Sequence, residues 1–426
     1  MHTILRFACF WVLAAAPLAT GSMPSTRPEE VGLSSERLGR IRETVQRHID
    51  AGNVTGAVTL VARKGRIAHF EAQGLADVES KRPMAKDTIF RLASMTKPVT
   101  AVAVMMLVEE GKIRLNDPVS KFVPEFKDAK VAIGRQAGPA MMAMMAPGQP
   151  PRDPEYYVVP ANREVTIQDM LTHTSGLASG GIGSRMVNKL APRQADDSLA
   201  SYIPRLATVP LDFQPGSQWA YSGAAGPDVL GRIVEIVSGL TYDQFLKQRL
   251  FDPLGMKDTF FYPPDSARPR LVTLYQRTPK GLEKSPNQDG FSTKTYFSGG
   301  AGLMSTAEDY LQFAQMLSNG GELNGKRYLG PRTVELMSAN HVGDMFNGKL
   351  GRPAQGMGFG FLMDVILDNV TSGMRLANGT FGWDGAFGTI FWADPKDKIV
   401  RVLMMQTQTP QLQRDFENAV MQAIID

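Results

Sequence analysis

Cysteine is nearly absent from this chain: Cys9 is the only one among 426 residues. No intramolecular disulfide bond can therefore form. With 43% apolar and 21% charged residues, the composition is that of an ordinary globular protein. A chain of this length buries a large core and needs no cross-links for stability. These figures exclude a small disulfide-stapled scaffold and fit two or three domains, or one large fold with an insertion.

Histidine is also scarce, and no cluster of basic residues stands out. The five histidines occur in no HExxH or other metal-ligand spacing, which argues against a zinc hydrolase. We therefore expect no metal and no other cofactor. The net charge is +4, and no run of Lys and Arg reaches the density of a nucleic-acid-binding patch. We expect no nucleic-acid partner.

Long apolar runs are missing too. No stretch approaches 18 apolar residues, so no membrane span is predicted. The N-terminus has Arg6, an apolar stretch over residues 7–16 and small residues around Ala19, which is the pattern of a secretory signal peptide. We predict that residues 1–22 are removed and that the protein is periplasmic or secreted. If translation starts at Met23, the protein is cytoplasmic.

One common hydrolase signature is absent. No Ser has Gly both two residues before it and two residues after it, so the nucleophile elbow of α/β-hydrolases is excluded. His173 is for this reason interpreted as a structural residue rather than as the base of a catalytic triad.

A different serine motif is present. Ser94 is the only Ser followed three residues later by a Lys, Lys97, and an apolar run over residues 99–108 comes next, typical of a buried helix. Residues three apart on a helix share one face, which brings the amine within reach of the hydroxyl. A desolvated Lys can be neutral near pH 7 and accept the hydroxyl proton. Alone, the pattern also fits an ordinary exposed helix start.

Tyr221 is the candidate for a proton shuttle. It lies among small residues in the segment 216–223, shortly before a predicted helix over residues 228–238. A neighbouring ammonium group is expected to lower the pKa of the phenol. Tyr221 would then act as base in acylation and as acid toward the leaving group. The alternative is a half-buried aromatic residue with a hydrogen-bonded hydroxyl.

A third segment, residues 381–389, places glycines within a strand pattern. Glycine lets a substrate or another strand approach the backbone closely. An exposed strand edge there would offer a main-chain N–H to a developing oxyanion. The alternative is a bulged strand with Trp383 in the core.

The order of helical and strand-like patterns predicts an α/β fold of the α+β type. We expect an antiparallel sheet flanked by helices, built from residues 23–115 and 294–426. Residues 116–293 are rich in Pro, Gly and helical apolar stripes and are predicted to form a mostly helical inserted domain. The active site is expected between the two parts.

Together, these segments resemble the family VIII carboxylesterases, which share the fold of class C β-lactamases and penicillin-binding proteins (D,D-peptidases). The resemblance extends from about residue 28 to the C-terminus. Its most similar blocks are residues 90–99, 171–177, 215–256 and 299–303.

The resemblance implies a role for each motif residue. Ser94 would be the acyl-forming nucleophile, and Lys97 and Tyr221 the general-base system. The backbone N–H groups of Ser94 and Ala386 would form the oxyanion hole. Which of Lys97 and Tyr221 accepts the proton first stays open, because coupled groups titrate as a pair.

Two departures from β-lactamases concern the substrate. Gly223 stands two residues after Tyr221, where β-lactamases usually carry an Asn that holds the acylamide side chain. Trp383, Asp384 and Gly385 replace the usual Lys-Thr-Gly, whose Lys binds a substrate carboxylate. Without that Lys, the motif has no positive charge to attract a substrate carboxylate. The Trp383 ring offers instead an aromatic surface for an apolar group of the substrate. Both changes favour neutral esters.

We therefore expect a serine carboxylesterase (EC 3.1.1 type) that hydrolyses short- to medium-chain esters through an acyl-enzyme at Ser94, with weak β-lactam hydrolysis as a side activity. The candidate substrate-binding residues are Trp383, Asp384, Gly385, Tyr156 and Tyr157. For the two tyrosines, packed or solvent-facing positions fit equally well. The alternatives are a class C-like β-lactamase or D,D-peptidase, an acyltransferase that uses an alcohol acceptor, and a non-catalytic cell-wall-binding or scaffold protein.

Overall fold

The computed structural model describes residues 22–134, 155–288 and 294–426. The predicted signal peptide, residues 1–22, therefore lies outside the described residues apart from Ser22. No helix within these ranges is long and apolar enough to cross a bilayer.

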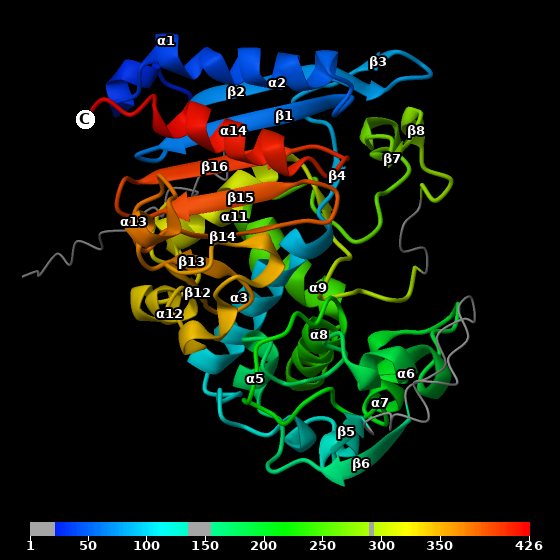
Figure 1. The fold of residues 1–426 in the computed structure, drawn as a ribbon. Coiled ribbons are helices and arrows are strands. Elements are labelled where there is room, and N and C mark those ends of the chain that lie inside the picture. The colour runs from blue at the N-terminus through cyan, green and yellow to red at the C-terminus, as the bar shows by residue number, and fades with distance from the viewer. Residues whose placement is uncertain (1–21, 135–154, 289–293) are drawn as a thin grey trace, which may run out of the picture.

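An eight-stranded antiparallel sheet forms the centre of the fold and unites both ends of the chain (Figure 1). Its strand order is β12-β13-β14-β15-β16-β1-β2-β3. The N-terminal and C-terminal segments join where β1 pairs with β16, with Val58 opposite Met404. The strands are β1 (Gly56–Arg63), β2 (Arg66–Asp77), β3 (Arg82–Pro83), β12 (Met357–Phe359), β13 (Asp364–Ile366), β14 (Phe381–Asp384), β15 (Ile390–Asp394) and β16 (Ile399–Met404).

Helices cover both faces of this sheet (Figure 1). On one face, α2 (Arg40–Asp50) packs with α14 (Pro410–Met421) and with the short α1 (Ser35–Leu38). α2 buries Ile41 and Val45, four residues apart, because residues at this spacing share one helix face. α11 (Ala307–Ser318) packs on the other face against β15, β16 and β1.

The helical part of the molecule is centred on two helices that pack against each other, α3 (Thr96–Glu109) and α8 (Ala225–Ser238). α3 is buried over residues 96–107, as is typical of a helix that is apolar all round. The range 116–293 also contributes α5 (Ile167–Leu171), α6 (Ile182–Leu190), α7 (Leu199–Leu206), α9 (Tyr242–Leu246) and α10 (Asp252–Leu254). Two further short helices, α12 (Pro331–Met337) and α13 (Asn369–Ser372), follow in the C-terminal range.

Four two-stranded sheets complete the described structure. They pair β4 (Phe90–Arg91) with β9 (Met304–Ser305), β5 (Lys130–Gly134) with β6 (Tyr156–Pro160), β7 (Tyr275–Thr278) with β8 (Gly281–Lys284), and β10 (Glu322–Leu323) with β11 (Lys326–Arg327).

The predicted architecture, an antiparallel sheet with flanking helices and a helical part, is confirmed. The domain boundaries stay a prediction. Part of the range 116–293 contacts the sheet side of the molecule, because Val272 donates to the carbonyl of Ile89 and Thr273 to that of Ala76.

Candidate active site

Ser94 lies in a single 3-10 turn, η2 (Ala93–Met95), between β4 and the start of α3. Ala93 has a φ of 46°, a left-handed conformation that residues with a side chain rarely adopt. Such positions persist where the surrounding structure enforces them, and they cluster at active sites. Ser94 itself is half-buried, so its hydroxyl stays within reach of a substrate.

Lys97 is completely buried beside Ser94, with its Nζ 3.1 Å from the Ser94 Oγ. The amine also donates to the carbonyl oxygens of Gly223, at 2.5 Å, and Gly300, at 2.8 Å. Burial lowers the pKa of Lys97 to about 7, because desolvation disfavours the charged form. A neutral amine has two N–H donors and one lone pair. The two carbonyls use both donors, so the lone pair faces Ser94.

Only a glycine at position 300 permits this arrangement. A Cβ on Gly300 would lie 2.7 Å from the Cα of Ala224 and 2.8 Å from the carbonyl oxygen of Gly223. A missing side chain is what lets two backbone segments approach this closely. The two carbonyls converge on Lys97 for this reason.

Tyr221 also contacts Ser94, with its hydroxyl 2.7 Å from the Ser94 Oγ. The Lys97 Nζ lies over the Tyr221 ring, 4.8 Å from its centroid. Burial raises the pKa of Tyr221 to about 12. The expectation that a neighbouring cation lowers this pKa is therefore wrong, because the phenol is desolvated and Lys97 carries only part of a charge near pH 7. Tyr221 stays protonated and donates to Ser94.

His173 packs behind Tyr221, with ring centroids 4.9 Å apart. Its Nδ1 accepts the N–H of Ser222 at 3.3 Å, and burial holds the pKa of His173 well below its usual value. No hydrogen bond joins His173 to Ser94 in the described part of the chain. A neutral ring in this place supports Tyr221, in agreement with the structural interpretation of His173.

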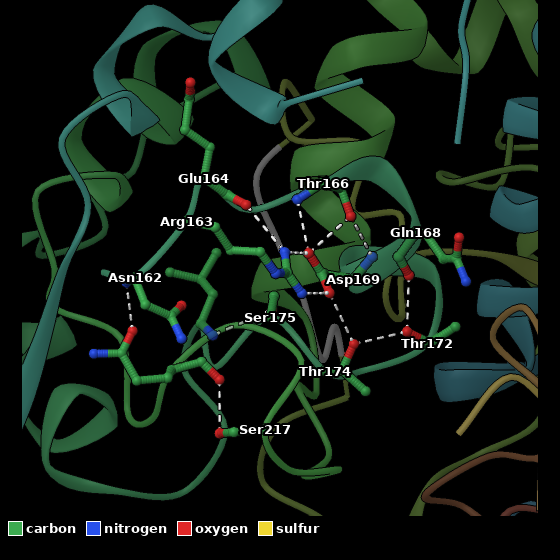
Figure 2. Close-up of polar contacts among 12 residues, drawn as sticks. Asn162, Arg163, Glu164, Thr166, Gln168, Asp169, Thr172, Thr174, Ser175 and Ser217 are labelled. Carbon is green, nitrogen blue, oxygen red and sulfur yellow. Dashed lines mark hydrogen bonds and ion pairs between the residues drawn. The ribbon is translucent and has the colours of Figure 1, made fainter. Parts of the chain in front are cut away.

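An ion pair at the start of α5 anchors the loop that carries His173 (Figure 2). Arg163 pairs with both carboxylate oxygens of Asp169, at 2.6 and 2.8 Å, and Asp169 also accepts from Thr174 at 3.1 Å. The carbonyl oxygen of His173 then accepts the N–H of Ala220 at 3.1 Å. The backbone that leads to the neighbouring tyrosine is thereby fixed.

The turn after β14 lies against the turn that carries Ser94. The Thr389 Oγ1 donates to the carbonyl oxygen of Leu92 at 3.2 Å, and a Cβ on Gly385 would lie 2.2 Å from that same oxygen. Within the described residues, the N–H groups of Ser94 and Ala386 donate to no protein acceptor. Two free donors on segments in contact fit an oxyanion hole, although this role stays a prediction.

Trp383 is 1% exposed and packs on Tyr221, with ring centroids 5.8 Å apart. The Arg352 guanidinium lies 5.6 Å from the Trp383 ring centroid and forms ion pairs with Asp384, at 2.9 Å, and Asp364, at 2.7 Å. A cation that the sequence analysis did not identify therefore balances the Asp384 carboxylate. Substrate contact by these residues and by Gly385 stays a prediction.

Tyr156 and Tyr157 lie on β6 in the small β5–β6 sheet, at the opposite end of the molecule from β1 and β2 in Figure 1. Tyr157 is 47% exposed. No hydrogen bond or ring contact connects either tyrosine to Ser94 in the described ranges. The structure thus does not bring them together with the Ser94 cluster, and their role in substrate binding stays a prediction.

Asp228, in the first turn of α8, is a site residue that the sequence analysis missed. Its buried carboxylate accepts from the Tyr296 hydroxyl at 2.6 Å, the Ser298 hydroxyl at 2.7 Å and the Gly300 N–H at 3.1 Å. It therefore holds in place Gly300, the residue whose carbonyl accepts from Lys97. Its place as the acidic residue in the first turn of α8 was a weak signal, because α8 also carries Arg232 and Glu235.

The residues described here thus gather a serine, a buried near-neutral lysine and a protonated tyrosine around one hydroxyl. Among the described residues, no three His, Cys, Asp or Glu side chains are grouped to hold a metal ion. The sequence model of the Beta-lactamase family matches residues 41–424. The chain belongs to this family. It is a serine hydrolase on the β-lactamase/D,D-peptidase-like fold, and these two predictions are confirmed.

Three similar proteins refine the place of the chain within the Beta-lactamase family. Protein Rv1367c of Mycobacterium tuberculosis is 37% identical over 386 residues, which cover 87% of this chain and 90% of that protein. Esterase EstB of Burkholderia gladioli is 34% identical over 367 residues, 80% of this chain and 83% of EstB. The solved structure of EstCE1, described as a hydrolase with promiscuous acyltransferase activity, matches with a TM-score of 0.74 and 29% identity over 91% of this chain and 99% of EstCE1. The resemblance to family VIII carboxylesterases is thereby confirmed.

Proposed function

We propose that this chain is a serine carboxylesterase that hydrolyses short- to medium-chain esters through an acyl-enzyme at Ser94. One observation carries the proposal: Lys97 is buried, its pKa is near 7, and two backbone carbonyls use its donors so that its lone pair faces Ser94. An amine in this state is a general base at neutral pH.

The geometry supports a definite order of proton transfers. Lys97 takes the Ser94 proton while the Ser94 Oγ attacks the ester carbonyl carbon. The N–H groups of Ser94 and Ala386 donate to the oxyanion. The carbon–oxygen bond to the alcohol then breaks, and Tyr221 donates its proton to the departing oxygen. Lys97 then returns its proton to Tyr221. In the second half of the reaction, a water molecule attacks the acyl carbon and gives a proton to Lys97. The bond between that carbon and the Ser94 Oγ breaks, and the Oγ takes the proton from Lys97 as the acid leaves.

β-Lactams are expected to be poor substrates. Their ring carboxylate needs a cation beside the strand that carries Asp384, β14, and Arg352, which lies there, already pairs with Asp364 and Asp384. A paired guanidinium offers little net attraction to a further anion.

A side-by-side rate comparison tests this function. Protein lacking residues 1–22 is assayed with p-nitrophenyl esters of increasing chain length and with nitrocefin, and Ser94→Ala serves as the control. We expect fast ester turnover and slow nitrocefin turnover, both lost in the control. Fast nitrocefin turnover with negligible ester turnover would instead identify a β-lactamase.

Acyl transfer to an alcohol is the second candidate, because an alcohol and water attack the same acyl-enzyme. The printed description of EstCE1 as a hydrolase with acyltransferase activity favours it. Adding a primary alcohol to the ester assay and measuring the new ester separates transfer from hydrolysis.

Replacing Asp228 by Asn is expected to move the acid limb of the pH–rate profile to lower pH. Only neutral Lys97 accepts the Ser94 proton, so kcat/KM rises as pH rises through the Lys97 pKa, near 7. The Asp228 charge favours the ammonium form of Lys97 and raises that pKa, so its removal lowers the midpoint. Asp265→Asn, which removes an exposed carboxylate, is the matched control. An unshifted midpoint in Asp228→Asn would contradict this coupling.

A further inference from the structure

A cavity of about 570 Å³ has Ala224 and Ala301 in its lining. Each of these alanines follows directly in the chain one of the two glycines, Gly223 and Gly300, whose carbonyls bind Lys97. The cavity wall is therefore one residue along the chain from each group that holds the catalytic amine. The volume of the cavity is typical of pockets that hold small molecules.

The proposed function decides which half of an ester enters this cavity, and the inference rests on that function. The alcohol leaves beside the Tyr221 hydroxyl, which lies 2.7 Å from the Ser94 Oγ. The oxyanion points to the N–H groups of Ser94 and Ala386. The acyl chain is left with the remaining direction, and the cavity with Ala224 and Ala301 in its lining is the candidate to hold it.

Most of the cavity wall suits an apolar acyl stem. When an apolar acyl chain packs against aromatic and aliphatic side chains, no polar group of the wall loses its hydration, so binding carries no desolvation cost there. The aromatic and aliphatic lining residues include Phe261, Tyr262, Tyr296, Leu303 and Met304.

One cation in the wall has unused donors. The Arg193 guanidinium stacks on Tyr296, 3.4 Å from the ring centroid, and lies 4.8 Å from the Tyr202 centroid. Stacking holds the planar group in place and leaves its N–H edges open. Its Nε is 3.8 Å from the nearest Asp197 oxygen, and Arg193 donates no hydrogen bond within the described ranges.

The other charged groups around the cavity are already engaged. Asp197 accepts from Arg205 at 2.8 and 2.9 Å. Asp228 accepts three hydrogen bonds. Arg91, the second cation of the lining, donates to backbone carbonyls. Arg193 is thus the lining cation placed to bind a ligand.

We propose that this cavity binds the acyl part of the ester and that Arg193 selects acyl chains that end in a carboxylate. The planar fork of an arginine binds a carboxylate through two parallel hydrogen bonds.

Two p-nitrophenyl esters of equal chain length test the proposal: the hexanoate and the monoester of adipic acid. We expect Arg193→Gln to lower kcat/KM for the adipate monoester by about tenfold or more, mainly through KM, and to leave the hexanoate within about twofold. Arg193→Lys should retain part of the preference. Arg185→Gln removes an exposed charge on α6 outside the cavity lining and should change neither rate.

Equal loss on both esters in Arg193→Gln, or no loss on the adipate monoester, would overturn the proposal. The outcome is distinguishable from failure of the proposed function. If the wild-type protein hydrolyses hexanoate and the ratio of the two rates does not depend on Arg193, the carboxylate selection alone is wrong. If the wild-type protein hydrolyses neither ester, the esterase function is wrong and the selection falls with it.

Discussion

Replacing Lys97 by methionine is expected to lower kcat/KM for a p-nitrophenyl ester by about 10²–10⁴-fold, the usual contribution of a positioned general base. Methionine has a similar length and suits the buried position, but it has no lone pair basic enough to take the Ser94 proton. The loss should appear mainly in kcat, because Lys97 contacts Ser94 and backbone carbonyls and takes up the proton only as the reaction proceeds. Initial rates between pH 6 and 9 measure it.

Lys127→Met is the matched control, because Lys127 is exposed and has no role in the proposed mechanism. It should behave like the wild-type protein, and circular dichroism should show that both variants fold. Activity of Lys97→Met within tenfold of wild type at every pH would mean that Lys97 is not the base. Tyr221 would then be the remaining candidate.

Ser94→Ala is expected to reduce ester turnover to the uncatalysed background, a fall of about 10⁴-fold or more by analogy with other serine nucleophiles. The side-chain oxygen contacts only Lys97 and Tyr221 among the described residues, so its removal leaves the rest of the site in place. Steady-state rates and the inhibition constant of the acid product separate loss of chemistry from loss of binding. The inhibition constant should stay within about threefold, since ground-state contacts remain.

Ser217→Ala is the control for the loss of a serine hydroxyl, because Ser217 is an exposed serine in the same segment as Tyr221. This variant should keep full activity. Residual turnover in Ser94→Ala that saturates with substrate and exceeds background would point to a different nucleophile.

The reactive residues were predictable because their signals are local. Ser94 and Lys97 are three residues apart, and the short segments around Tyr221 and Ala386 carry recognisable patterns. Local patterns of this kind depend on hydrogen bonds and side-chain periodicity over a few residues.

The supporting residues were not predictable because they act across long sequence separations. Gly300 binds Lys97 from 203 residues away, and Arg352 meets Asp364 and Asp384 only once the sheet has formed. The sign of the Tyr221 pKa shift was wrong for a related reason. A sequence shows that a cation lies near, but the desolvation that outweighs it is a property of the assembled core.

The most direct test of the account is to find where a covalent inhibitor attaches. A p-nitrophenyl alkylphosphonate loses p-nitrophenolate to the nucleophile as an ester does, but the phosphonyl group then stays on the enzyme because it is not hydrolysed. Mass spectrometry of the intact protein and of its peptides locates this group. The account predicts one adduct, on Ser94, that is absent in Ser94→Ala and forms far more slowly in Lys97→Met. An adduct on another residue, or one that persists in Ser94→Ala, would contradict it.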